Sequence, residues 1–203
     1  MKVSENWEIA KEELSNSDSI MMKIIEIYDG EKMQLKNNAF LTLIRSVVGQ
    51  QISVKAADSV WKRLEELCKH EIQPDKIKVF SEDELRSVGL SKSKANYIQN
   101  ISKSDVLDTN WANLSDKEVI DLLCQIKGIG RWTAEMFLIF HLDRPNILPL
   151  GDIGLIKAIE LNYNNGEKIS KDRINTYRQK WSPWCTVATW YLWRSLDPIP
   201  VNY

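Results

Sequence analysis

The stretch Leu123-Cys-Gln-Ile-Lys-Gly-Ile-Gly-Arg-Trp-Thr-Ala134 carries the strongest structural signal in this chain. Two glycines, Gly128 and Gly130, lie between two apolar patterns of helical period. Glycine tolerates positive φ and has no Cβ, so the turn can be tight and a phosphate oxygen can approach its backbone amides. The next helix adds its N-terminal amides and the positive end of its dipole. Residues 123–134 therefore predict a hairpin that grips phosphate.

Side chains around the two glycines fit the same prediction. Lys127 and Arg131 place positive charge beside the turn, and the Thr133 hydroxyl is a candidate donor to the same phosphate. An ordinary C-cap glycine between two helices remains an alternative. A nucleotide-binding loop is a weaker one, because no strand precedes the turn and Thr133 stands where the third glycine of that fingerprint belongs.

Helical periodicity extends over almost the whole chain. Capping-box patterns at Ser81 with Glu84 and at Ser115 with Glu118 mark two helix starts. No segment alternates like a strand, so we expect an all-α protein of about ten helices. Residues 1–39 also have helical character. The other expected helices cover residues 40–48, 53–67, 81–89, 94–102, 115–126, 133–141, 153–161, 170–181 and 183–195.

Composition limits the class of protein. Of the 203 residues 43% are hydrophobic, and the net charge is −1. This charge argues against a protein that binds nucleic acid through a broadly basic surface, but it allows a protein that binds a few phosphates. Three scattered cysteines and two isolated histidines lack the spacing of a disulfide framework, a zinc site or an iron–sulfur cluster. No signal-peptide pattern or long uncharged stretch occurs, so we expect a cytoplasmic protein, associated with the nucleoid or located in the nucleus according to the cell type, and no membrane partner.

A single carboxylate follows the hairpin in Leu148-Pro-Leu-Gly-Asp-Ile-Gly154. Asp152 is well placed to cap a helix that begins at Ile153. A tight turn can also deliver such a carboxylate to a reaction site. The two roles are compatible, and the residues alone leave both open.

Taken together, the hairpin and this loop resemble the helix-hairpin-helix DNA glycosylase superfamily. Residues 45–53, Arg-Ser-Val-Val-Gly-Gln-Gln-Ile-Ser, resemble its alkylpurine branch, the 3-methyladenine DNA glycosylase II type, and residues 88–98 fit as well. The resemblance spans residues 40–193. It implies a single helical domain with two lobes, approximately 40–125 and 1–39 plus 126–203, flanking a cleft that binds DNA and the base. The N-terminal β domain of the best-known member is expected to be missing.

The resemblance also implies a reaction, hydrolysis of an N-glycosidic bond through a transition state with positive charge on the sugar. Asp152 matches the catalytic position, where a carboxylate stabilises that charge or orients a water. Bifunctional members carry a lysine nucleophile directly after the position of Arg131. Here the residue is Trp132, so we expect a monofunctional enzyme that leaves an abasic site.

The resemblance also implies which residues contact the base after it has been extracted from the duplex. Trp132 and Trp193 match aromatic positions of the base pocket, although core packing is the alternative for any single tryptophan. Met136 stands where the best-known relative has an aromatic residue, which leaves the substrate range open. Gln51 matches the wedge that fills the gap left by a flipped nucleotide, and a surface glutamine is the alternative. Four further tryptophans are assigned to the core: Trp61, Trp181, Trp184 and Trp190.

The resulting hypothesis is a monomeric, monofunctional DNA glycosylase that removes alkylated bases of the 3-methyladenine or 7-methylguanine type from duplex DNA and so initiates base excision repair. It requires no cofactor or metal, and a monovalent cation at the hairpin carbonyls is left open. One alternative is a noncatalytic hairpin module that only binds DNA, against which Asp152 speaks. The other is a bifunctional glycosylase/lyase for oxidised bases, against which Trp132 speaks.

Overall fold

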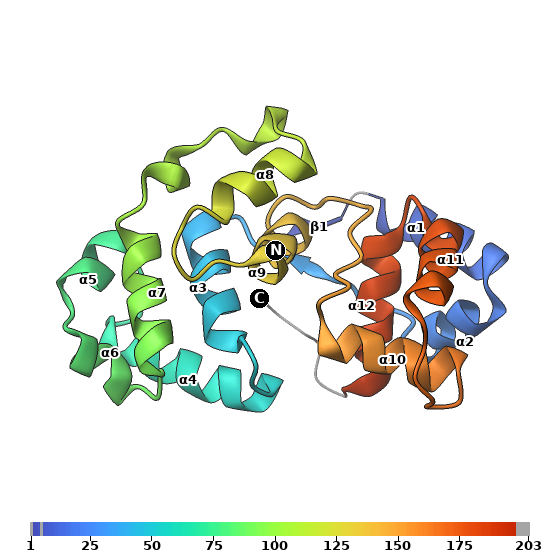
Figure 1. Cartoon of the computed structure of the whole chain (residues 1–203), viewed down its shortest axis with the longest axis horizontal. Coiled ribbons are helices and arrows are strands. Elements are labelled where there is room, and N and C mark those ends of the chain that lie inside the picture. Colours follow the sequence, from blue (N-terminus) through green and yellow to red (C-terminus); the bar gives the residue numbers. More distant parts are fainter. Residues whose placement is uncertain (1, 5, 198–203) are drawn as a thin grey trace. The chain divides into compact units, whose positions relative to one another are not determined.

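The computed structural model describes residues 2–4 and 6–197, and helices dominate them (Figure 1). The all-α prediction is confirmed. The α-helices are α1 (Trp7–Ser17), α2 (Ser19–Ile27), α3 (Ala39–Gly49), α4 (Val54–Leu67), α5 (Pro74–Val79), α6 (Glu82–Ser87), α7 (Lys92–Ser102), α8 (Asp116–Leu123), α9 (Arg131–Phe140), α10 (Ile153–Tyr163), α11 (Lys171–Trp181) and α12 (Cys185–Leu196). The 3-10 helices are η1 (Asp105–Asp108) and η2 (Trp111–Asn113), and the strands are β1 (Lys2–Val3) and β2 (Gln34–Leu35).

Local signals in the sequence correctly marked most helix starts. Both capping boxes are present, with the Ser81 and Ser115 hydroxyls accepting from the backbone amides of Glu84 and Glu118. The end of α8 was predicted less well. The helix ends at Leu123 instead of continuing to residue 126, because the backbone amides of Gln125 and Ile126 donate to carbonyls three residues back and tighten the chain into turns.

The two strands were not expected from the sequence. β1 and β2 pair antiparallel, with Lys2 opposite Leu35 and Val3 opposite Gln34. Strands of two residues are too short to show the alternation that identifies a strand in a sequence.

The first of two compact units contains the described residues up to Leu35 and those from Asp143 onward. In it α12 packs against α1, α2, α10 and α11. Trp7 of α1 contacts Trp190 and Tyr191 of α12, with ring centroids 5.1 and 5.6 Å apart. Every residue of α12 from Cys185 to Arg194 is buried, so this helix forms the core on which the loop before α10 and α10 itself are mounted.

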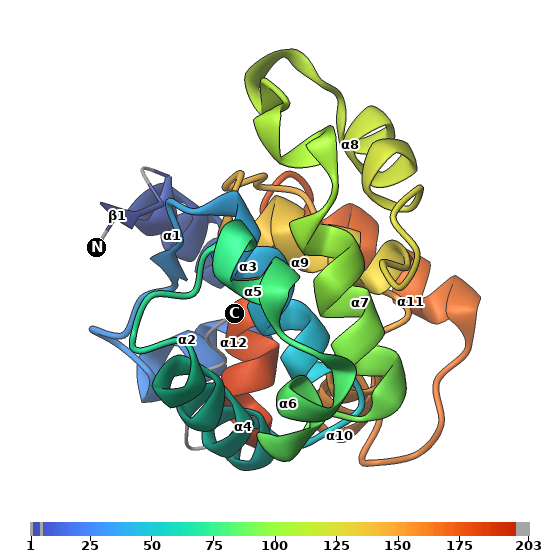
Figure 2. The same cartoon turned by 90° about the vertical axis from the view of Figure 1, so that its left-hand side faces the viewer.

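The second unit runs from Lys36 to Leu142. Its central helix α3 packs against α4, α7 and α9, and α8 packs against α9 (Figure 2). The α9 residues from Thr133 to Phe140 are all buried. Trp111 of η2 packs edge-on against Phe137, with ring centroids 4.9 Å apart. The hairpin therefore opens a helix that belongs to the core of its unit.

The units divide the chain after Leu35 and Leu142, whereas the lobes expected from the sequence divide it after about residues 39 and 125. Residues 126–142 were assigned to the lobe that contains both termini, but they lie in the compact unit with residues 36–125. The cause is α9, whose apolar side chains pack against α3 and α8. Helical periodicity shows that α9 is apolar and does not show which helices it contacts.

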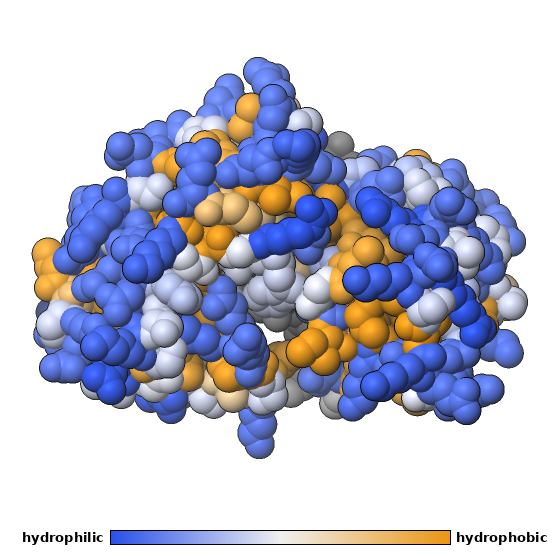
Figure 3. All heavy atoms as spheres, viewed as in Figure 1, coloured by the Kyte–Doolittle hydropathy of each residue, from blue (hydrophilic) through white to orange (hydrophobic). Residues whose placement is uncertain are grey.

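Polar side chains cover most of the visible outer side of α4–α7 in Figure 3, as expected for the solvated face of amphipathic helices. Trp181 and Trp190 are buried, as the sequence predicted, whereas Trp61 and Trp184 are only half-buried. The Arg45 guanidinium lies over the ring of Trp61, with its Cζ atom 5.4 Å from the ring centroid. The Nε1 atom of Trp184 donates to the Glu13 carboxylate over 2.6 Å. In the described part of the chain no helix is long and apolar enough to cross a membrane.

Candidate active site

The hairpin turn contains a glycine that the structure requires. Gly128 adopts φ = +106°, in the left-handed region that favours glycine. A Cβ at this position would lie 2.1 Å from Cγ of Tyr97, so the backbone of the turn rests directly on that ring. Ile126 and Ile129 are buried on either side of Gly128, and the Ile129 amide donates to the Ile126 carbonyl over 3.0 Å. The side chain of Ile129, between the two glycines, therefore anchors the turn on the core of its unit.

Gly130 differs from Gly128. It is the N-cap of α9 with φ = −99°, a conformation open to any residue, and a Cβ there would meet no atom within 4 Å. As a glycine it contributes no side-chain cap to α9. The first turn of α9 thus begins beside open space on the exposed side of Gly130, which is the arrangement that anion binding at a helix N-terminus needs.

Two amide side chains hold the hairpin carbonyls. Gln50, at the end of α3, donates from Nε2 to the Gly128 carbonyl over 3.4 Å and to the Thr133 hydroxyl over 3.0 Å. Asn100 of α7 donates to the Lys127 carbonyl over 3.0 Å. No local signal in the sequence pointed to these contacts, because the partners are far apart in the chain. They fix the course of the turn that the glycines allow.

The polar residues predicted to bind phosphate have different environments. Lys127 and Arg131 are exposed, and the Nε atom of Arg131 donates to the carboxylate of Glu135 over 2.9 Å. That carboxylate is almost entirely buried, so Arg131 also offsets a buried negative charge. Thr133 is 1% exposed and its hydroxyl accepts from Gln50, which gives it a supporting contact inside the hairpin. Its donation to a phosphate stays a prediction.

Gln51, the predicted wedge, lies in the loop between α3 and α4. Its side chain is exposed and its backbone is in the left-handed region, with φ = +57°. The neighbouring Ile52 is also exposed, at 40%. Lys94 donates from Nζ to the Val48 carbonyl over 2.9 Å and so holds the end of α3, and burial lowers the pKa of this lysine. The loop thus projects two side chains from a braced helix end.

The two predicted pocket residues on α9 are placed unequally. Trp132 is half-buried at the start of the helix. Met136, one turn later, is 0% exposed and packs in the core of the second unit. A role for either in binding a base stays a prediction.

Asp152 belongs to the first unit, where a turn sets its position. Its backbone amide donates to the Pro149 carbonyl over 2.9 Å. Its Oδ1 atom accepts from the Leu155 amide over 2.6 Å, which confirms Asp152 as the N-cap of α10. The same oxygen accepts from Nε1 of Trp193 on α12 over 3.1 Å. The carboxylate is half-buried, and Ile153 directly after it is 82% exposed.

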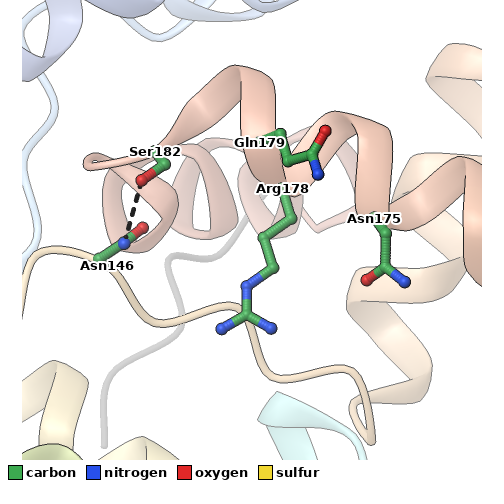
Figure 4. A pocket seen from close by; sticks show the side chains of 5 residues that line it. All are labelled: Asn146, Asn175, Arg178, Gln179 and Ser182. Carbon is green, nitrogen blue, oxygen red and sulfur yellow. Dashed lines mark hydrogen bonds between the residues drawn. The ribbon is translucent and has the colours of Figure 1, made fainter.

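A separate polar pocket of about 400 Å³ lies against α11 in the first unit (Figure 4). Figure 4 shows the Arg178 side chain extending into it, with an Asn146 to Ser182 hydrogen bond of 3.1 Å at one side. Its lining residues are Asn146, Asn175, Arg178, Gln179 and Ser182. They include no carboxylate and no residue predicted to act on DNA, so the pocket is separate from the candidate site.

Side chains that could hold a metal do not gather anywhere in residues 2–4 and 6–197. Cys68 and Cys185 are buried, Cys124 is exposed, and all three are free thiols. Burial raises the pKa of Cys68 and raises that of Cys185 to about 11, which keeps both thiols protonated and inert.

A helical protein with a glycine hairpin at the start of a core helix, and a carboxylate on a turn that follows it, defines a recognisable class. Residues 44–183 match the model of the HhH-GPD superfamily base excision DNA repair protein family. The chain therefore belongs to this superfamily.

Relatives within the superfamily agree with the match. DNA-3-methyladenine glycosylase 1 of Schizosaccharomyces pombe is 28% identical over 182 residues, which cover 86% of this chain and 80% of the relative. A solved structure of a 3-methyladenine DNA glycosylase from the same organism, in complex with abasic DNA, has a TM-score of 0.82 at 28% identity, covering 92% of this chain and 95% of that one. A DNA-3-methyladenine glycosidase of Bacillus halodurans is 34% identical with a TM-score of 0.72, covering 92% and 88%.

Proposed function

We propose that this protein is a monofunctional DNA glycosylase that hydrolyses the N-glycosidic bond of alkylated bases in duplex DNA. The single observation that carries the proposal is the carboxylate of Asp152, held by two donors on a turn after the hairpin in a chain of this superfamily. The names of the relatives support alkylated purines of the 3-methyladenine type as the substrate class. Base excision repair would begin with the abasic site that this reaction leaves.

Each part of the proposed site has a physical task. The amides at the start of α9 bind a phosphate, and Lys127 and Arg131 add charge beside it. Asp152 stabilises positive charge on the sugar and orients the attacking water, so the bond breaks without a covalent intermediate. Trp132 stands where a strand-cutting relative would need an amine nucleophile, which supports hydrolysis alone. Trp132, Met136 and Trp193 remain proposed pocket residues, and Gln51 the proposed wedge.

Partners and location extend the same proposal. The binding partner is double-stranded DNA containing damaged bases, and the protein acts as a monomer in the compartment that holds the DNA. No cofactor is required. A monovalent cation would have to be held by the backbone carbonyls of the hairpin. The side-chain amide of Gln50 donates to the carbonyl of Gly128, and that of Asn100 donates to the carbonyl of Lys127.

The test uses duplex DNA treated with a methylating agent and measures released bases and strand breaks separately. We expect base release without breaks, and we expect Asp152→Asn to lower excision at least 100-fold while DNA affinity changes little. Binding without release would show a noncatalytic module. Breaks without added alkali would show the lyase alternative, and wild-type excision by Asp152→Asn would remove Asp152 from the mechanism.

A further inference from the structure

Trp193 and Gly154 meet at the carboxylate of Asp152, and this contact carries an inference that rests on the proposed function. Among the described residues, Oδ1 of Asp152 accepts hydrogen bonds from the Leu155 amide at 2.6 Å and from Nε1 of Trp193 at 3.1 Å. One of these donors belongs to the helix that Asp152 caps, and the other is Trp193 of α12, 41 residues from Asp152 in the sequence. Two donors from different helices fix the direction in which the carboxylate plane faces.

Trp193 itself has little freedom. It is 6% exposed and lies in α12, the helix that is buried from Cys185 to Arg194. A buried indole N–H needs an acceptor, because leaving it unpaired is costly. Because the indole is fixed by the packing of α12, its N–H determines where Oδ1 of Asp152 lies.

Gly154 leaves room for this contact. It lies in the first turn of α10, without the positive φ that would itself require glycine. A Cβ at this position would lie 3.2 Å from Oδ1 of Asp152, 3.8 Å from Cδ1 of Trp193 and 3.9 Å from Nε1 of Trp193. Glycine inside a helix is unfavourable compared with alanine, so a local explanation for it is missing. The close approach of the carboxylate and the indole supplies one.

We propose that Trp193 and Gly154 are positioning residues for Asp152, with the Trp193 N–H orienting the carboxylate and Gly154 leaving room for it. This assigns to Trp193 a task at the reacting sugar that differs from stacking on the base. A stacking role depends on the aromatic ring, whereas this role depends on the N–H. Variants that separate the ring from the N–H therefore decide between them.

The first experiment replaces Trp193 by phenylalanine and by benzothienylalanine, an isostere that keeps the ring shape and lacks the N–H. Single-turnover excision and DNA affinity are measured on each lesion that the wild-type protein removes. We expect excision to fall about 10- to 100-fold in both variants, by the same factor on every lesion, with DNA affinity unchanged within about twofold. Trp184→Phe is the matched control, because it also loses an indole hydrogen bond, to Glu13, and should excise at the wild-type rate.

The second experiment introduces Gly154→Ala. Alanine favours the helix while the displaced carboxylate weakens its cap, so the melting temperature should stay about level, whereas excision should fall about 10-fold. Loss of excision without loss of stability is a result that a merely structural glycine would not give.

Two outcomes would overturn the proposal while leaving the proposed function intact. One is a wild-type excision rate in the benzothienylalanine variant, and the other is a loss confined to lesions with a cationic base. Each counts only if Asp152→Asn is inactive in the same assay. If Asp152→Asn excises normally, the proposed catalytic residue has failed first, so the two failures are distinguishable.

Discussion

At Gly128 the backbone adopts φ = +106° and rests on the ring of Tyr97, whereas Gly130 has φ = −99° and open space beside it. Only the first of these glycines is required by the fold of the free protein. The second leaves room at the start of α9, where a ligand and not the protein would fill it. Gly128 is therefore required for folding, whereas Gly130, two residues later, is proposed to be required for binding.

Alanine at each position tests this separation. We expect Gly128→Ala to lower the free energy of unfolding by about 2 kcal/mol or more, because the left-handed backbone is strained and the Cβ collides with Tyr97. Gly130→Ala should change it by less than about 0.5 kcal/mol and still weaken DNA binding roughly fivefold, since its methyl group obstructs the approach of a phosphate. Urea denaturation and fluorescence anisotropy measure the two quantities. Equal stability losses would contradict this division of roles.

At the scale of elements, the end of α3 and the start of α9 are joined by Gln50. Its amide contacts both the Gly128 carbonyl and the Thr133 hydroxyl, which lie on either side of the turn. The adjacent residue, Gln51, is the proposed wedge. One side chain thus ties the loop that carries the wedge to the hairpin that is proposed to bind phosphate.

Removing this tie should affect DNA binding as well as stability. We expect Gln50→Leu to lower the free energy of unfolding by about 1 kcal/mol and to weaken DNA binding severalfold, because the turn loses the amide that fixes its carbonyl. Gln99→Leu is the matched control, since Gln99 donates to the Phe80 carbonyl over 2.7 Å in the same unit but away from the hairpin. It should lose similar stability and keep its DNA affinity. Equal DNA affinity in both variants would show that Gln50 has only a structural role.

At the scale of the whole molecule, the charge balance limits how DNA is held. The chain has 27 basic and 28 acidic residues, so long-range attraction to DNA is weak and a small number of local contacts must supply the affinity. Backbone amides suit this task because they bind phosphate without net charge. Lys127 and Arg131 are the charged groups proposed to add to these amides, and both lie at the hairpin.

This balance predicts a shallow salt dependence of DNA binding. The slope of log K against log salt concentration should be about −2 to −4, as expected for a few neutralised phosphates. Lys127→Ala and Arg131→Ala should each reduce its magnitude by about one. Lys117→Ala is the control, because that exposed lysine pairs with Asp121 elsewhere in the unit and should leave the slope unchanged. If neither Lys127→Ala nor Arg131→Ala changes the slope, the phosphate contacts lie elsewhere on the protein.

The sequence by itself determined the features that depend on neighbours in the chain: the helices, both capping boxes, Asp152 as the cap of α10, and the glycine turn before α9. These follow from periodicity and hydrogen bonds over three or four residues. Only the tertiary structure decided that α9 packs with α3, that Gln50 holds the hairpin, and that Trp193 reaches Asp152. Such contacts join residues far apart in the chain, and their geometry arises when whole helices pack, so no local pattern records it.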